Sequence, residues 1–169
     1  IDRVDLAESA GRAYLSVIDY KTNPQDLKLS DVWEGLALQL LVYQAVLLEQ
    51  AAQFTKLPVT VAGVFYFGIQ QSMERVPNPP PPNQSRKDAG LLDGLALADA
   101  KVLELLGGTD FLRRAKLKND GTFTKTSRVA DAMQMSELLT WLRGKLLELA
   151  GKILAGNASV RPYRKSNGQ

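Results

Sequence analysis

Two aspartates and a lysine near the start of the chain are of types suited to metal-assisted chemistry. Asp2 lies in a stretch of strand character, Ile1 to Leu6, and Asp19 and Lys21 lie at the end of a second stretch, Tyr14 to Tyr20. The two stretches flank a Glu-Ser-Ala-Gly turn, which is typical of a β-hairpin. If the turn is centred on its Ala-Gly pair, antiparallel pairing places Asp2 directly opposite Asp19. Facing carboxylates repel each other unless a cation lies between them, so the pair predicts a divalent metal.

Side-chain alternation groups these residues further. Lys21 falls on the same strand face as Asp19, whereas Tyr20 offers only its backbone carbonyl to that face. Two carboxylates, one carbonyl and water suit the octahedral oxygen coordination of Mg²⁺. The ammonium of Lys21 cannot bind metal, but it can orient a water molecule or stabilise charge on a phosphate, so the group predicts metal-assisted phosphodiester hydrolysis. Asp5, three residues from Asp2, is expected on the opposite face in a structural role. On spacing alone, solvent-facing charges remain the competing interpretation.

Composition limits the alternatives. The chain has 169 residues, of which 45% are hydrophobic and 23% charged, as expected for one globular domain. It contains neither cysteine nor histidine, so any metal must be held by oxygen. The net charge of +3 is compatible with a polyanionic partner but does not indicate one. No apolar run reaches the roughly 18 residues of a membrane span, and no secretory leader is visible, which favours a cytoplasmic location.

The segments after the hairpin predict the elements that position the site. Asp31, with Glu34 three residues on, resembles a capping box at the start of one long apolar helix extending to Phe54. Gln39 and Tyr43 are four residues apart and therefore share a face of that helix. Val59 to Ile69 is rich in β-branched and aromatic residues, which predicts a buried strand.

The second half of the chain continues this alternation. The segment Pro77 to Pro82 predicts an exposed loop, and Leu91 to Leu106 predicts a helix or a partly extended stretch. Asp120-Gly121 predicts a hairpin turn, and Ser136 to Leu154 predicts a long amphipathic helix capped by Gly156. Strands and helices interleave, so the expected class is α/β (α+β), with a mixed central sheet flanked by helices.

The ordered series IDRVD, VIDYKT and GLALQLLVY resembles the motifs of RecB-type nucleases in the PD-(D/E)XK superfamily. In those proteins an Asp precedes a D-x-K strand and a Q-x-x-x-Y helix. The resemblance implies a restriction-endonuclease-like core, with Asp2 and Asp19 as metal-binding carboxylates and Lys21 as the catalytic lysine. It also implies that Gln39 and Tyr43 support the site and touch DNA. Mg²⁺ is the implied cofactor, and Mn²⁺ can substitute for it.

Later segments resemble the nuclease region of the AddB family of helicase–nuclease subunits. They are FYF at Phe65 to Phe67, GLL at Gly90, the KNDGTFTKTS hairpin and RPYR at Arg161 to Arg164. Arg161 and Arg164 are accordingly expected to bind DNA or support the site. In that family RPYR leads into a cysteine cluster that helps hold an iron–sulfur centre. Residues 1–169 are thus expected to form a RecB-like nuclease domain cut at both ends, without the upstream helicase-like region and the downstream cysteines.

The resemblance implies a Mg²⁺-dependent DNA exonuclease domain acting in double-strand break repair and recombination. Its expected partners are DNA and an AddA-type helicase–nuclease subunit, with no membrane, and the isolated piece is expected to be weakly active or inactive. Two alternatives remain open. One is a stand-alone RecB-family exonuclease of the Cas4-like kind, and the other is a catalytically silent nuclease fold that serves as a scaffold or DNA-binding module.

Overall fold

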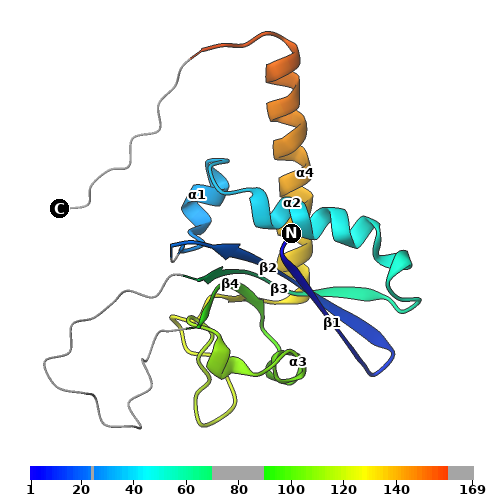
Figure 1. Ribbon diagram of the computed structural model, residues 1–169, viewed down its shortest axis with the longest axis vertical. Coiled ribbons are helices and arrows are strands. Elements are labelled where there is room, and N and C mark those ends of the chain that lie inside the picture. Colours follow the sequence, from blue (N-terminus) through cyan, green and yellow to red (C-terminus); the bar gives the residue numbers. More distant parts are fainter. Residues whose placement is uncertain (24, 70–89, 160–169) are drawn as a thin grey trace, which may run out of the picture.

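The structure is a computed structural model that describes residues 1–23, 25–69 and 90–159. Its centre is a five-stranded sheet of order β1-β2-β3-β4-β5 (Figure 1). The pairs β1–β2 and β3–β4 are antiparallel, whereas β2–β3 and β4–β5 are parallel, which confirms the predicted mixed sheet. The strands span Arg3–Ser9, Arg12–Lys21, Val59–Gly68, Leu92–Leu97 and Val129–Ala130.

The first two strands form the predicted hairpin. Ala10 and Gly11 connect them and both have positive φ, 50° and 72°, as a two-residue type I′ turn requires. The strand pairing begins with Arg3 opposite Ile18, so continuing it by one residue places Asp2 beside Asp19. A tight local turn therefore fixes the relation between the two aspartates.

The predicted long helix after the hairpin is wrong, because the segment forms two helices. The first, α1 (Leu29–Trp33), starts after Lys28 without a side-chain cap, and α2 (Gln39–Glu49) is separate. Gly35 ends α1 with φ of 83°, and its N–H donates to the carbonyl of Val32 at 2.9 Å. This left-handed cap stops the helix whatever the apolar pattern around it.

The other helices agree more closely with expectation. The predicted helix or extended stretch divides into β4 and α3 (Ala100–Leu105), and α4 (Ala132–Leu154) starts four residues earlier than predicted. Asp131 and Gln134 form a capping box there, and Gly156 closes the other end with φ of 66°. Two short 3₁₀ helices, Ala51–Gln53 and Thr109–Phe111, complete the elements.

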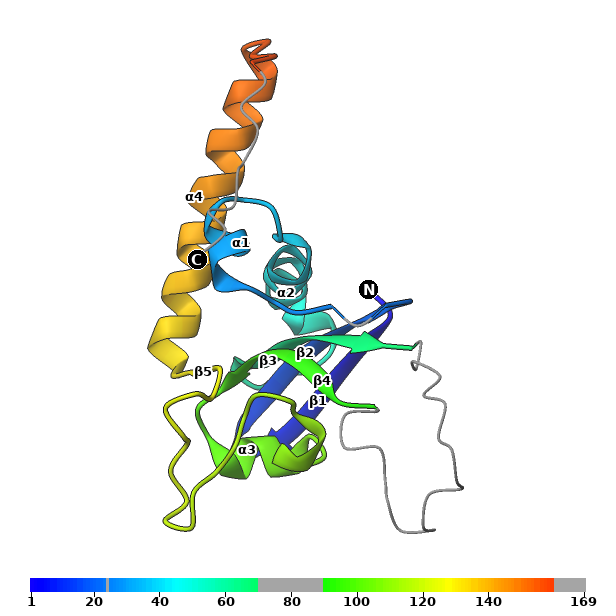
Figure 2. The same ribbon diagram turned by 90° about the vertical axis from the view of Figure 1, so that its left-hand side faces the viewer.

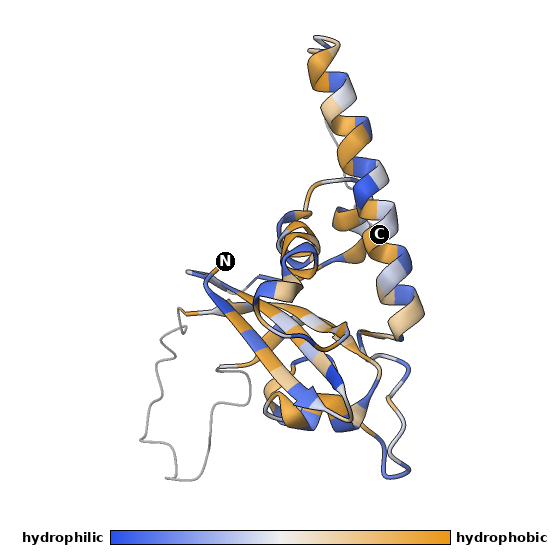
Figure 3. Ribbon diagram, turned by 90° about the vertical axis from the view of Figure 1, so that its right-hand side faces the viewer, coloured by the Kyte–Doolittle hydropathy of each residue, from blue (hydrophilic) through white to orange (hydrophobic). Residues whose placement is uncertain are grey.

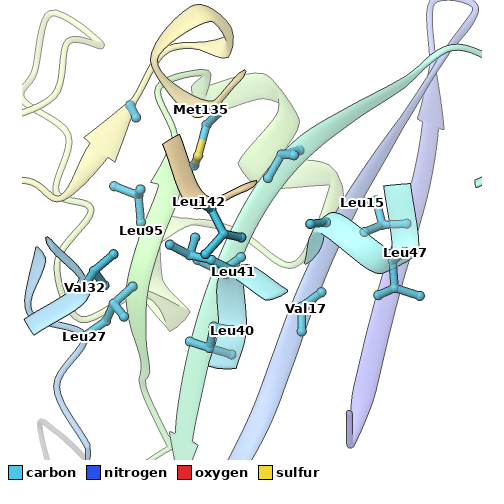
Figure 4. Packing of buried hydrophobic residues seen from close by; sticks show 14 of the residues in the cluster. Leu15, Val17, Leu27, Val32, Leu40, Leu41, Leu47, Leu95, Met135 and Leu142 are labelled. Carbon is cyan, nitrogen blue, oxygen red and sulfur yellow. The ribbon is translucent and has the colours of Figure 1, made fainter. Parts of the chain in front are cut away.

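Helices cover both faces of the sheet (Figure 2). On one face, α2 and α4 bury the main core, whose largest members include Leu15, Val17, Leu40, Leu41 and Leu142 (Figure 4). On the other face, α3 and the segments around it pack on a smaller cluster that includes Ile18 and Phe65. The far part of α4 extends past the sheet and alternates polar with apolar residues (Figure 3). None of the helices in the described ranges has the length and apolar character needed to cross a membrane.

The predicted turn at Asp120-Gly121 is present, since Leu117 and Phe123 form an antiparallel bridge around it. The predicted loop Pro77 to Pro82 lies outside the described residues, as do Arg161 and Arg164.

Candidate active site

The site forms at the end of β2, on the sheet face that α2 covers. Asp19 is 5% exposed, and its Oδ2 lies 2.6 Å from the Nζ of Lys21. That oxygen is buried and receives no well-aligned hydrogen bond from the residues that the structure describes. A buried carboxylate oxygen normally has full hydrogen-bond partners, so Asp19 retains capacity to bind a cation.

Asp2 reaches the same place from the neighbouring strand. Its side chain is exposed, and its Oδ2 accepts a 2.6 Å hydrogen bond from the backbone N–H of Tyr20. The structure therefore brings Asp2 next to Asp19, while the ring of Tyr20 packs against Phe67 with centroids 5.6 Å apart. Asp5 is engaged by Arg3 in a 2.7 Å ion pair instead.

Helix α2 restrains the lysine. The Nζ of Lys21 donates to Oε1 of Gln39 at 2.8 Å, and Nε2 of Gln39 lies 2.7 Å from the Tyr43 hydroxyl. Gln39 is the first residue of α2, so the break after α1 presents this amide to the end of β2. The structure thus brings together Asp2, Asp19, Lys21, Gln39 and Tyr43.

Tyr66 belongs to the same group but was missed in the sequence. It stands opposite Asp19 in the β2–β3 register, is 4% exposed, and has its ring centroid 5.4 Å from the Nζ of Lys21. The available signal was a phenol at the centre of an otherwise apolar strand, where a hydroxyl is costly to bury.

The electrostatics keep Lys21 charged. Its pKa lies above the ordinary value, chiefly because the ammonium hydrogen-bonds to Asp19, while burial acts in the opposite direction. Burial raises the pKa of the Tyr66 hydroxyl, which therefore stays neutral near pH 7. Lys21 consequently acts in this arrangement as a cation and not as a base.

A second charged cluster, which the sequence did not predict, lies at the edge of β4. Asp93 stands opposite Tyr66 on β3 and accepts from the backbone N–H of Leu27 at 3.4 Å. Arg114 and Arg128 lie 3.3 Å from its two oxygens, and both also pair with Asp26. Burial raises the pKa of Asp93, whereas the hydrogen bond from Arg128 lowers that of Asp26. We call these four side chains the edge network; they tie the segment after β2 to the sheet.

The donor set fits a hard divalent cation. The carboxylates of Asp2 and Asp19 are oxygen donors, and the Oδ2 of Asp19 lacks aligned partners. Within the described residues no group of three or more acidic, cysteine or histidine side chains gathers in one place, so water and backbone oxygens would complete the coordination. In this structure the Lys21 ammonium neutralises Asp19.

Known proteins support this interpretation. The family model described as the PD-(D/E)XK nuclease superfamily matches residues 1–168. The chain is 40% identical to an ATP-dependent helicase/deoxyribonuclease subunit of Desulforudis audaxviator, over 98% of the chain and 15% of that protein. It is 34% identical to the protein of the same name from Thermoanaerobacter sp. and 33% identical to that from Clostridium tetani, again over 15% of each. The chain thus spans about 15% of the length of these relatives.

Proposed function

Because the chain belongs to the PD-(D/E)XK nuclease superfamily, we propose that it hydrolyses DNA phosphodiester bonds as the nuclease domain of a bacterial helicase–nuclease subunit. The observation that carries this proposal is the buried, incompletely bonded carboxylate of Asp19 beside a lysine that α2 holds in place. Asp2 and Asp19 would hold Mg²⁺ with the Tyr20 carbonyl, and Mn²⁺ can replace it. When bound, Mg²⁺ supplies charge neutralisation and polarises the phosphate.

The protein's own groups supply the remaining steps. The charged Lys21 stabilises the negative charge that develops on the phosphate during attack. Gln39 restrains the ammonium through one hydrogen bond, and Tyr43 restrains Gln39 in turn. Asp2 is exposed, so the phosphate and the attacking water approach from its side of the hairpin. Exonuclease action on DNA ends follows from the helicase–nuclease setting.

The wider setting is also part of the proposal. The names of the relatives combine helicase and deoxyribonuclease activities in one subunit of a larger enzyme, which supports a partner helicase–nuclease subunit of the AddA type, DNA as substrate and a role in double-strand break repair and recombination. A cytoplasmic location and an iron–sulfur centre in the intact protein accompany this assignment. The same names favour a large helicase–nuclease over a stand-alone Cas4-like enzyme.

The test is a nuclease assay on the full-length protein assembled with its partner subunit. We expect Asp19→Asn to lower the rate of DNA degradation by about 100-fold or more, because the substitution removes a metal-binding charge. Asp5→Asn is the matched control, since it makes the same change in the hairpin at a residue that pairs with Arg3. Full nuclease activity in the Asp19 variant would instead support a silent scaffold.

A further inference from the structure

Tyr66 occupies the strand position between the two buried aspartates of the sheet. It stands opposite Asp19 on one side and opposite Asp93 on the other, so all three side chains share the face that α2 covers. At 4% exposure, its ring is part of the main core. Neither the metal nor the phosphate chemistry proposed above uses this residue.

The ring of Tyr66 forms one wall of the Lys21 environment. Asp19 lies 2.6 Å from the ammonium, Gln39 accepts from it at 2.8 Å, and the ring centroid of Tyr66 lies 5.4 Å away. An ammonium within about 6 Å of an aromatic face is attracted by the ring quadrupole, most strongly where water is excluded. A lysine side chain has four rotatable carbon bonds, so two polar contacts alone leave it able to swing.

We propose that Tyr66 is a positioning residue for Lys21, whose ring face holds the ammonium beside Asp19 and keeps water from solvating it on the sheet side. This inference rests on the proposed nuclease function and adds a residue to it. The contact is to the ring, so the hydroxyl is dispensable. Positioning of this kind raises the turnover rate more than it strengthens substrate binding.

The test compares three variants of the full-length protein assembled with its partner subunit. Tyr66→Phe keeps the ring and should retain kcat within about twofold, whereas Tyr66→Leu should lower kcat about tenfold with KM for DNA little changed. Phe65→Leu is the matched structural control. Phe65 is equally buried in the same strand but packs in the cluster on the opposite face, so its kcat per folded molecule should stay near that of the wild type.

Each outcome has a defined meaning. Equal losses of kcat in the Leu variants at positions 66 and 65, or a loss in Tyr66→Phe as large as in Tyr66→Leu, would overturn the positioning role. If Tyr66→Leu does not fold, Tyr66→Met supplies the same comparison with an unbranched apolar side chain. Lys21→Ala is measured in parallel: unchanged activity there would refute the nuclease assignment itself, whereas loss of activity there leaves the Tyr66 comparison to be judged alone.

Discussion

Two aspartates flank Tyr66 on the same sheet face, and the protein treats them differently. Asp19 and Asp93 are each 5% exposed. Asp93 accepts from the Leu27 backbone and faces the guanidinium groups of Arg114 and Arg128, so its buried charge is well compensated. Asp19 has one lysine beside it and an Oδ2 without an aligned hydrogen bond in the described part of the chain.

The difference separates structure from chemistry. A buried carboxylate with complete partners holds chain segments together, and breaking such a group costs stability. A buried carboxylate with incomplete partners is a poor structural element, and groups of this kind cluster at functional sites. Asp93 accordingly ties the segment after β2 to β4, whereas Asp19 is available to a metal and a phosphate.

The largest effect should come from the lysine beside Asp19. We expect Lys21→Met in the assembled full-length protein to lower kcat about 1,000-fold, because the charge on the phosphate loses its nearest cation. Steady-state nuclease kinetics measure this effect, with the thermal unfolding midpoint as a check on folding. The midpoint should change little or rise, since the substitution removes a partly buried charge. A loss of stability without a loss of turnover would place Lys21 in the structural class instead.

Asp93 should show the opposite pattern. Asp93→Ala leaves Arg114 and Arg128 without their buried partner, and we expect the free energy of unfolding to fall by about 3 kcal/mol. Urea unfolding measures the change, and the nuclease rate per folded molecule should remain within a few-fold. If the variant is as stable as the wild type, the edge network does not have the structural role assigned to it.

A smaller effect is expected at the first residue of α2. Gln39→Leu removes the acceptor for the Lys21 ammonium while keeping a similar volume, and should lower kcat about tenfold, a typical result of losing one hydrogen bond to a charged group. Tyr43→Phe acts one contact further away and should cost less. If Tyr43→Phe lowers kcat more than Gln39→Leu, the order of the relay is wrong.

The smallest effect concerns pH and the edge network. The pKa of Asp26 is lowered in the folded state, so its ion pair stabilises the protein above the unfolded-state pKa of about 4 and this stability is lost as the pH falls below it. The difference in free energy of unfolding between wild type and Asp26→Asn should therefore be about 1 kcal/mol at pH 7 and shrink towards pH 3. A difference that grows on acidification would contradict this sign.

The sequence predicted what depends on local rules. The Ala10-Gly11 turn and strand alternation bring Asp2, Asp19 and Lys21 together, and helical spacing pairs Gln39 with Tyr43. The edge network could not be predicted in this way, because Asp26 and Arg128 are 102 positions apart and meet only through the sheet order.

Two further differences have physical causes of their own. The break at Gly35 was missed because apolar periodicity continues across it, whereas its left-handed backbone decides the outcome. Tyr66 was missed because its place beside Lys21 depends on the parallel pairing of β2 with β3, which no local pattern reveals. Both are cases in which tertiary pairing or one backbone angle outweighs the surrounding sequence.

The central claim is that Asp19, and not Asp93, is kept available for a divalent cation. Calorimetric titration of the full-length protein with Mg²⁺ tests it without requiring activity, using Asp19→Asn and Asp93→Asn as a matched pair. We predict that Asp19→Asn loses the binding at this site and that Asp93→Asn retains it. Equal binding of Mg²⁺ by the wild type and the Asp19 variant would contradict the account.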